Sequence, residues 1–191
     1  MGVQPLFESL FERDLGRGER IVWTGQPDAK RIFTSADLFL VPFSLVWGGF
    51  ALYWEATVLG LTGGPPAPPA FMVFGVPFVV LGLYFMFGRF FYQRWAKQNT
   101  YYALTNRRAL IVRHLRGRSV DAIMLDSAPS IQVSTRADGS GTIVFGTTTP
   151  FDAIYGNTGL TFFRRGVYTP AFYDIPDVEA VARQINELRQ G

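Results

Sequence analysis

The chain has 191 residues, of which 48% are hydrophobic, 16% aromatic and only 17% charged, and its formal net charge is +3 at pH 7. Soluble domains carry about 25% charged residues, so this composition predicts apolar surface that faces something other than water. The small net charge argues against a general nucleic-acid binder, and the absence of cysteine excludes disulfides and thiolate metal sites.

Residues 1–37 form an N-terminal segment whose fold the sequence leaves open. Five apolar residues suit one face of a short helix, which would either lie on a membrane surface or pack against a soluble domain. They are Leu6, Phe7, Leu10, Phe11 and Leu15. The segments Ile21–Trp23 and Ile32–Phe33 are expected to be extended and to add to a sheet.

Two long apolar runs follow and predict a transmembrane hairpin over residues 38–95. Leu38–Trp54 holds 17 uncharged residues and continues beyond Glu55 to Leu61, and Phe71–Gly88 holds 18. A spanning helix needs about 20 residues, because a helix rises 1.5 Å per residue and the hydrocarbon core is roughly 30 Å thick. A chain this short cannot bury two such helices in a soluble core. We therefore expect helices at about 38–61 and 70–92.

The loop between the runs, residues 62–69, predicts the orientation of the hairpin. Its four prolines and two glycines cannot continue a helix, and it carries no lysine or arginine. Lys30 and Arg31 precede the first run, and no signal-peptide cleavage site follows it. The positive-inside bias then predicts a multi-pass protein of the cell (inner) membrane with both termini in the cytoplasm. The juxtamembrane cations after the second run are Arg89, Arg94 and Lys97.

Small residues recur at helical spacing in both runs and predict a helix-packing face. Two interpretations stay open: a seam for self-association into a homo-oligomer, and packing within the hairpin, which we favour. The face comprises Ser44, Gly48 and Ala51 on the first helix and Gly75 and Gly82 on the second.

Glu55 is the ionisable residue within the apolar runs. An intramembrane carboxylate suggests an ion or proton path. However, it lies ~26 Å along the helix from Leu38, near the far interface, so we expect it to face water beside Trp54. An oligomeric pore is disfavoured because neither helix has a polar stripe.

From about Gln98 the pattern changes to short strands separated by turns, and residues 98–191 are expected to form a cytoplasmic domain. The turns Thr105–Arg107 and Asp138–Gly141 predict two hairpins. Strands are expected at Thr100–Leu104, Arg108–Arg113, Ser119–Leu125, Ile131–Val133, Thr142–Gly146, Leu160–Arg164 and Ala171–Ile175.

The chain ends in a predicted helix whose apolar residues Val178, Val181, Ile185 and Leu188 share one face. Seven strands followed by an amphipathic helix suggest a small barrel or bent sandwich that the helix closes on one side. The predicted fold class is thus an α+β membrane protein, with a two-helix hairpin before the strands.

Three segments carry a resemblance to a known family: Gly18–Pro27 (GERIVWTGQP), Tyr101–Ile111 (YYALTNRRALI) and Phe172–Asp177 (FYDIPD). Together they resemble the bacterial pleckstrin-homology-like (PH-like) integral membrane proteins. The resemblance implies a membrane hairpin before a cytoplasmic domain of seven strands in two sheets, closed by a C-terminal helix. It provides no catalytic residues.

A basic segment between Arg89 and Arg118 holds eight cations and no acidic residue. Such a segment is attracted to anionic headgroups by roughly 1 kcal/mol per residue. In eukaryotic PH domains a basic first hairpin reads phosphoinositides. We favour the alternative that these arginines orient the domain and touch ordinary anionic lipid, because bacterial membranes normally lack inositol lipids. The basic patch comprises Arg107, Arg108, Arg113, Arg116 and Arg118.

Signals for catalysis are poor. His114 is the only histidine, so no histidine cluster can hold a metal, and no phosphate-binding glycine loop or nucleophile elbow occurs. We expect no catalytic residue, no metal and no cofactor, and no nucleic-acid partner. The favoured function is a membrane-anchored binding or scaffold module that contacts lipid headgroups or a protein partner. The alternative is an accessory subunit of a larger membrane complex, bound through the hairpin.

Overall fold

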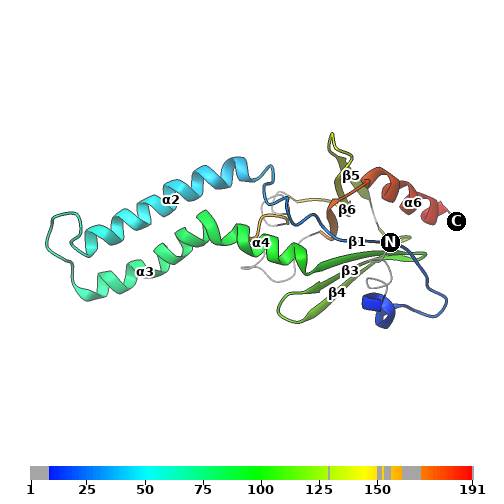
Figure 1. Ribbon diagram of the computed structural model, residues 1–191, viewed down its shortest axis with the longest axis horizontal. Helices are drawn as coiled ribbons and strands as arrows, with labels where there is room; N and C mark the ends of the chain where they lie inside the picture. Colours follow the sequence, from blue (N-terminus) through cyan, green and yellow to red (C-terminus); the bar gives the residue numbers. More distant parts are fainter. Residues whose placement is uncertain (1–8, 129, 150–151, 153–155, 161–168, 191) are drawn as a thin grey trace.

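The computed structural model describes residues 9–128, 130–149, 152, 156–160 and 169–190. A long helical hairpin projects from one end of a body made of two sheets and a C-terminal helix (Figure 1). The α+β fold class is therefore confirmed: two long apolar helices precede sheets of four and three antiparallel strands in the described residues.

The hairpin consists of α2 (Asp37–Val58) and a second helix built from α3 (Pro69–Leu83), the π-helical turn η2 (Tyr84–Gly88) and α4 (Arg89–Gln98). Both helices are long and apolar enough to cross a membrane. Most of their large apolar side chains face outward, for example Val46, which is 75% exposed, and Phe74, which is 62% exposed. Contiguous apolar patches of this extent are rare on soluble monomers.

Small residues let the two helices of the hairpin approach closely. A Cβ atom on Gly82 would lie 2.9 Å from the Cα atom of Gly48, so no larger side chain fits there without moving the backbone. Ala51 lies beside the same crossing. All five residues of the predicted helix-packing face are buried within the hairpin: Ser44, Gly48, Ala51, Gly75 and Gly82.

The second helix runs to Gln98, beyond the predicted end at residue 92. Its last turns carry buried polar residues at four-residue spacing, namely Arg89, Gln93 and Lys97. Residues four apart share a helix face, and on this face Arg89 meets Asp37 of α2, while Gln93 and Lys97 meet Asn157 and Asp174 of the body. The loss of hydrophobicity near residue 92 therefore marks a change of environment and not the end of the helix.

The four-stranded sheet has the order β1-β2-β3-β4, with all neighbours antiparallel. Its strands are β1 (Ile21–Gly25), β2 (Thr100–Thr105), β3 (Arg108–His114) and β4 (Arg118–Met124). The N-terminal strand β1 joins the edge beside β2, as expected for Ile21–Trp23, whereas residues 32–33 belong to no strand. The body thus draws on residues from both sides of the hairpin.

The three-stranded sheet contains β5 (Ile131–Thr135), β6 (Gly141–Phe145) and β7 (Ala171–Ile175) in that order. The strand expected at Leu160–Arg164 lies outside the described residues from position 161 onward. Helix α6 (Val178–Gln190) buries Val178, Val181 and Ile185 in the core between the two sheets, and Leu188 packs beside them. The predicted closing helix is confirmed.

The described part of the N-terminal segment packs on the outer face of the four-stranded sheet. Phe11, just before the short 3-10 turn η1 (Glu12–Asp14), is fully buried against Ala103, Leu110 and Val112. Phe11 thus packs against the two-sheet body, which is one of the two alternatives that the sequence left open. Leu6 and Phe7 lie outside the described residues.

Candidate functional site

Hydrogen bonds and ion pairs connect the hairpin to the sheets at a polar junction. Only Asn99 separates α4 from β2, so the second helix of the hairpin leads into the sheet without a flexible linker. The Gln26 side chain, just beyond β1, donates to the Gln98 carbonyl at 2.7 Å and ties the edge strand to the same helix end. The helix and the body are therefore expected to move together.

Lys97 and Asp174 form a buried ion pair at the centre of this junction. The Lys97 Nζ atom lies 2.7 Å from Asp174 Oδ2, and the side chains are 5% and 2% exposed. Lys97 also donates to the Arg31 carbonyl. Among the three predicted juxtamembrane cations, Lys97 therefore forms an ion pair inside the protein, while Arg94 is exposed.

Asp174 gathers further donors around its carboxylate. Arg136 Nη2 lies 2.6 Å from Oδ1, and the Asn157 amide donates to Oδ2 at 2.7 Å. Burial by itself would raise the pKa of Asp174, but the Lys97 charge and these donors hold it below its usual value. The residue also has a φ of +50°, an uncommon conformation for a side chain other than glycine. Such strain persists only where surrounding contacts impose it.

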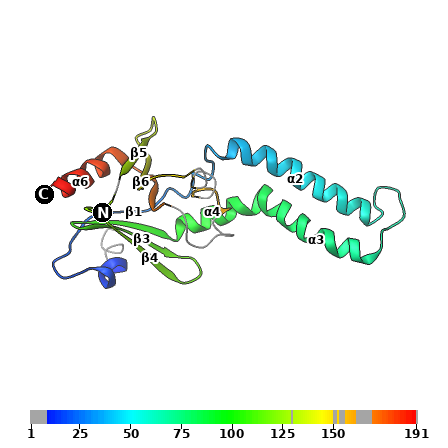
Figure 2. The same cartoon turned by 180° about the vertical axis from the view of Figure 1, so that it is seen from behind.

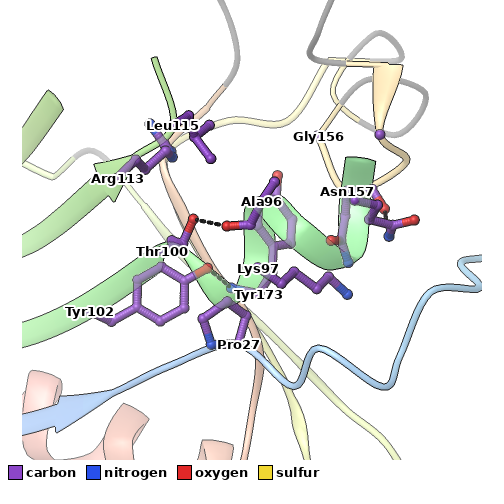
Figure 3. A pocket seen from close by; sticks show the side chains of 12 residues that line it. Pro27, Ala96, Lys97, Thr100, Tyr102, Arg113, Leu115, Gly156, Asn157 and Tyr173 are labelled. Carbon is purple, nitrogen blue, oxygen red and sulfur yellow. Dashed lines mark hydrogen bonds between the residues drawn. The ribbon is translucent and has the colours of Figure 1, made fainter. Parts of the chain in front are cut away.

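A small cavity of about 60 Å³ opens beside this ion pair (Figure 3). Its walls come from the last turns of α4, the start of β2, the end of β3 and the segment 156–159. Figure 3 shows Lys97, Thr100, Tyr102 and Asn157 arranged around it, with the Tyr102 hydroxyl accepting a hydrogen bond from the Tyr173 backbone N–H at 3.1 Å.

Hydrogen bonds connect the segment 156–160 to the second helix of the hairpin beside the cavity. The Tyr84 hydroxyl donates to the Gly159 carbonyl at 2.7 Å, and the Gln93 amide donates to the Asn157 carbonyl. Gly159 has a φ of +79°, and a Cβ atom there would lie 2.2 Å from the Arg89 carbonyl oxygen. Glycine is thus required at this contact by both conformation and space.

A second buried ion pair joins the two helices of the hairpin at the body end. Arg89 and Asp37 pair with side chains only 1% and 5% exposed. Thr34 donates to the Asp37 carboxylate from its backbone N–H at 2.5 Å and from its hydroxyl at 2.9 Å. The Arg89 guanidinium also lies 4.1 Å from the centre of the Phe90 ring. Arg89, predicted as a juxtamembrane cation, is therefore neutralised within the protein.

The predicted basic patch is divided by acidic residues of the N-terminal segment. Arg108 makes a two-pronged contact with Glu19, with both N···O distances at 2.8 Å. The hydrogen bond from Arg108 is the main reason why the pKa of Glu19 falls from 4.5 to about 2. Arg118 pairs with Asp14 in the same segment. Arg113 pairs with Asp121 of β4 at 2.5 Å. Arg108, Arg113 and Arg118 therefore have carboxylate partners within the protein.

The two remaining arginines of the patch lie at opposite ends of the sheet. Arg107 is exposed in the β2–β3 turn, six residues or roughly 20 Å along the strand from the helix. Arg116 is exposed in the β3–β4 turn, which follows Arg113, the partner of Thr100 at the start of β2. Figure 2 shows the β3–β4 turn on the side of the hairpin and the β2–β3 turn at the far end.

We had expected Glu55 to face water beside Trp54. The structure instead places its carboxyl against the neighbouring helix. A Cβ atom on Gly75 would lie 1.8 Å from Glu55 Oε2, so the carboxyl occupies the space that this glycine leaves. Oε2 is buried and has no hydrogen-bond partner among the described residues. The absence of a side chain at Gly75 makes the inward position accessible.

Sequence reasoning missed the junction because its residues are far apart in the chain. Asp37, Gln93, Asn157 and Asp174 were not among the predicted site residues. Asp174 lies in Phe172–Asp177, one of the segments that carry the family resemblance. Its position in that segment was the one sequence feature that could have marked it as a site residue. Nothing in the sequence linked it to Lys97, 77 residues earlier.

Comparison with protein families gives a match to the model described as "Bacterial PH domain" over residues 43–189. The matched region begins inside α2 and ends inside α6, so it includes most of the hairpin and strands β2 to β7 but not β1. Searches of curated proteins and of solved structures return no match.

Proposed function

Because the chain belongs to the bacterial PH domain family, we propose that it is a membrane-anchored binding module whose hairpin holds the two-sheet body at the cytoplasmic face of the membrane. The observation that carries the proposal is the continuous helix from Pro69 to Gln98, which reaches β2 after one residue. A body attached without a linker to a spanning helix must remain close to the headgroups.

The depth of the body follows from helix geometry. A hydrocarbon core of roughly 30 Å takes about 20 residues, which corresponds to Pro69–Gly88, the uncharged part of the second helix. Phe91 is 76% exposed and Phe87 56% exposed, so both suit lipid contact. The exposed Arg94 and Trp95 then fall at the interface, where basic and aromatic residues are favoured.

A labelling experiment tests the topology. The chain has no cysteine, so single cysteines can be introduced without background. We expect Thr62→Cys, in the loop between the helices, to react in intact cells with a membrane-impermeant maleimide. Asp138→Cys, in the β5–β6 turn, should react only after the cells are opened. Labelling of Asp138→Cys in intact cells, with Thr62→Cys protected, would contradict the proposed orientation.

We further propose that the β3–β4 turn contacts anionic headgroups through Arg116. This turn lies at the hairpin side of the sheet, whereas Arg107 lies at the far end (Figure 2). Headgroup attraction decays within a Debye length of about 8 Å at physiological ionic strength. The strand length of roughly 20 Å therefore removes Arg107 from this field.

The lipid contact is tested with a dye on Ser119→Cys in the full chain, reconstituted into liposomes that carry a headgroup quencher. Quenching should be stronger in anionic than in neutral liposomes and should weaken as salt is added. Arg116→Gln should lower it by about half, since one of the exposed cations near the surface is lost. Arg107→Gln is the matched control and should leave it unchanged. Equal quenching in both lipids, or equal effects of the two variants, would exclude this role for Arg116.

One observation favours the alternative of an accessory subunit bound through the hairpin. An apolar cleft of about 220 Å³ lies on the outside of the helix pair, lined by the aromatic side chains Trp47, Phe50, Trp54, Phe74 and Phe78. A photo-crosslinker at Phe74 would separate the two functions. Discrete protein adducts at Phe74 support the accessory subunit, and lipid adducts alone support the anchored module.

A further inference from the structure

Strand β5 forms an open edge of the three-stranded sheet. The strand order is β5-β6-β7, so β5 has a neighbouring strand on one side only in the described structure. Four of its five residues are exposed. An edge strand presents a row of unpaired backbone N–H and C=O groups, to which another strand can add.

The hydrogen bonds at the two ends of β5 show which of its residues face this edge. At one end the Gly146 N–H donates to the Ser130 carbonyl at 2.9 Å, and at the other the Arg136 N–H donates to the Ser140 carbonyl at 2.8 Å. Hydrogen-bonded residues alternate along an antiparallel pair, so the even-numbered residues of β5 face β6. The backbone groups of the odd-numbered residues face the open edge, and these residues are Ile131, Val133 and Thr135.

The edge lacks the features that usually keep edge strands apart. Natural edge strands commonly carry charged residues or proline, and residues 130–135 contain neither. By contrast, β4 at the edge of the four-stranded sheet contains Arg118 and Asp121. Val133 is 43% exposed, although it lies on the same side of β5 as Ile131, which packs on the core. An apolar position is therefore left uncovered at an uncharged edge.

We propose that β5 pairs with β5 of a second copy of this chain, antiparallel and about a two-fold axis, so that the two three-stranded sheets become continuous. In the register centred on Val133, this residue lies opposite itself, and Ile131 lies opposite Thr135 of the second copy. All three edge residues then form hydrogen-bonded pairs, and each pair exchanges two N–H···O=C bonds.

The side chains suit this self-pairing. The three edge residues are all β-branched, and such residues stabilise antiparallel pairs when they lie opposite each other. Like charges opposite each other would destabilise the pair. The charged residues nearest to β5, Arg136 and Asp138, lie opposite Ser130 and Ala128 of the second copy in this register. The edge is therefore self-complementary, as a two-fold interface requires.

The direction of β5 fits two copies anchored in one membrane, a fit that rests on the membrane-anchored function proposed above. Both copies share the membrane normal, so their two-fold axis must be parallel to it. Rotation about such an axis reverses a strand only if the strand lies across the normal. Figures 1 and 2 show the β5–β6 hairpin running across the long axis of the helical hairpin. Antiparallel pairing of β5 is thus compatible with both helical hairpins entering the same membrane.

Cross-linking of single cysteines in the full chain, reconstituted into liposomes, tests the register. Val133→Cys places two thiols on opposite residues whose Cα atoms lie about 5.5 Å apart, within the range of a disulfide. Gln132→Cys, exposed on the same strand, is the matched control. It opposes residue 134 of the second copy, so the two cysteines lie about 8 Å apart, too far for a disulfide. With a mild oxidant Val133→Cys should cross-link faster by about tenfold or more, because pairing raises the effective concentration of its thiols.

A charge exchange tests whether the contact joins identical positions. Val133→Lys and Val133→Glu each place like charges opposite each other and should weaken association by about tenfold. Mixed in equal amounts, the two variants place lysine opposite glutamate and should recover most of the association. Energy transfer between donor- and acceptor-labelled chains in liposomes measures it, with circular dichroism as the folding control. If either variant fails to fold, the cysteine comparison decides.

The outcomes separate this inference from the proposed function. Equal cross-linking of the two cysteine variants, or no recovery on mixing folded charge variants, overturns the self-pairing. Cross-linking of Val133→Cys in cells to a different protein, with no energy transfer between parent chains, also overturns it and assigns the edge to that partner. Neither measurement depends on which side of the membrane the body occupies. The self-pairing can therefore hold where the topology experiment contradicts the proposed orientation, and it can fail where that experiment supports it.

Discussion

Removing one partner of the Arg89–Asp37 ion pair should destabilise the protein by about 3–5 kcal/mol, because the remaining charge would be buried without compensation. Arg89→Met leaves the Asp37 carboxylate between the helices, where Thr34 is its remaining side-chain hydrogen-bond partner among the described residues. For a chain of this size such a loss corresponds to a fall in melting temperature of roughly 6–20 °C. Thermal unfolding of the full chain in a mild detergent measures it.

A double variant shows whether the effect belongs to the pair. Asp37→Leu with Arg89→Met replaces both charges by apolar side chains and should recover most of the stability, since an apolar pair of similar size often equals a buried ion pair. Arg94→Gln, exposed on the same helix, should change the melting temperature by less than about 2 °C. A double variant no more stable than the worse single one would mean that the charges act separately.

Ile185→Ala is expected to destabilise the two-sheet body by about 2–5 kcal/mol, the usual cost of truncating a large buried side chain. Ile185 is fully buried between the two sheets, with Val181 and Val178 on the same face of α6. The loss combines the apolar area no longer buried with the cavity left behind. Hydrogen exchange should therefore rise in β5 and β6, the strands that α6 contacts.

The matched control lies at the next position of the same helix. Asn186 is exposed, and Asn186→Ala should be neutral or slightly stabilising, because alanine has the higher helix propensity. If Ile185→Ala left both the melting temperature and the exchange of β5 and β6 unchanged, the helix would have to dock elsewhere in solution. Faster exchange confined to α6 would point to fraying of the helix alone.

Local sequence patterns were sufficient for the elements that depend on neighbours in the chain. The two apolar runs predict helices, because about 20 consecutive apolar residues match the length of a membrane-spanning helix. The 3–4 spacing of Val178, Val181, Ile185 and Leu188 likewise determined α6 and its buried face. The turns at residues 105–107 and 138–141 gave their hairpins, since turn residues and alternation are local signals.

The end of the second helix could not be read from hydrophobicity. The polar residues Arg89, Gln93 and Lys97 lower the local hydropathy, and only their burial against the body shows why the helix continues through them. A periodic polar face and the end of an apolar run look alike until the partner surface is known.

The pairing of the patch arginines with carboxylates likewise depends on the tertiary structure. Within the sequence segment 89–118 no acidic residue is present, yet Arg108 meets Glu19 across 89 positions and Arg118 meets Asp14 across 104. Pairing of β1 with β2 brings that N-terminal segment to the sheet. Charge counts along the chain cannot anticipate which cations such a contact will neutralise.

The sequence by itself thus determined the two apolar helices, the strands β2 to β7 and the closing helix, because these depend on periodicity and on turns of a few residues. Only the tertiary structure decided that Lys97 meets Asp174, that Gln93 keeps an unpaired oxygen, and that a cavity opens between them. Those features require the end of α4, β7 and the segment 156–159 to meet at one place. Long-range contacts of this kind have no local sequence signature.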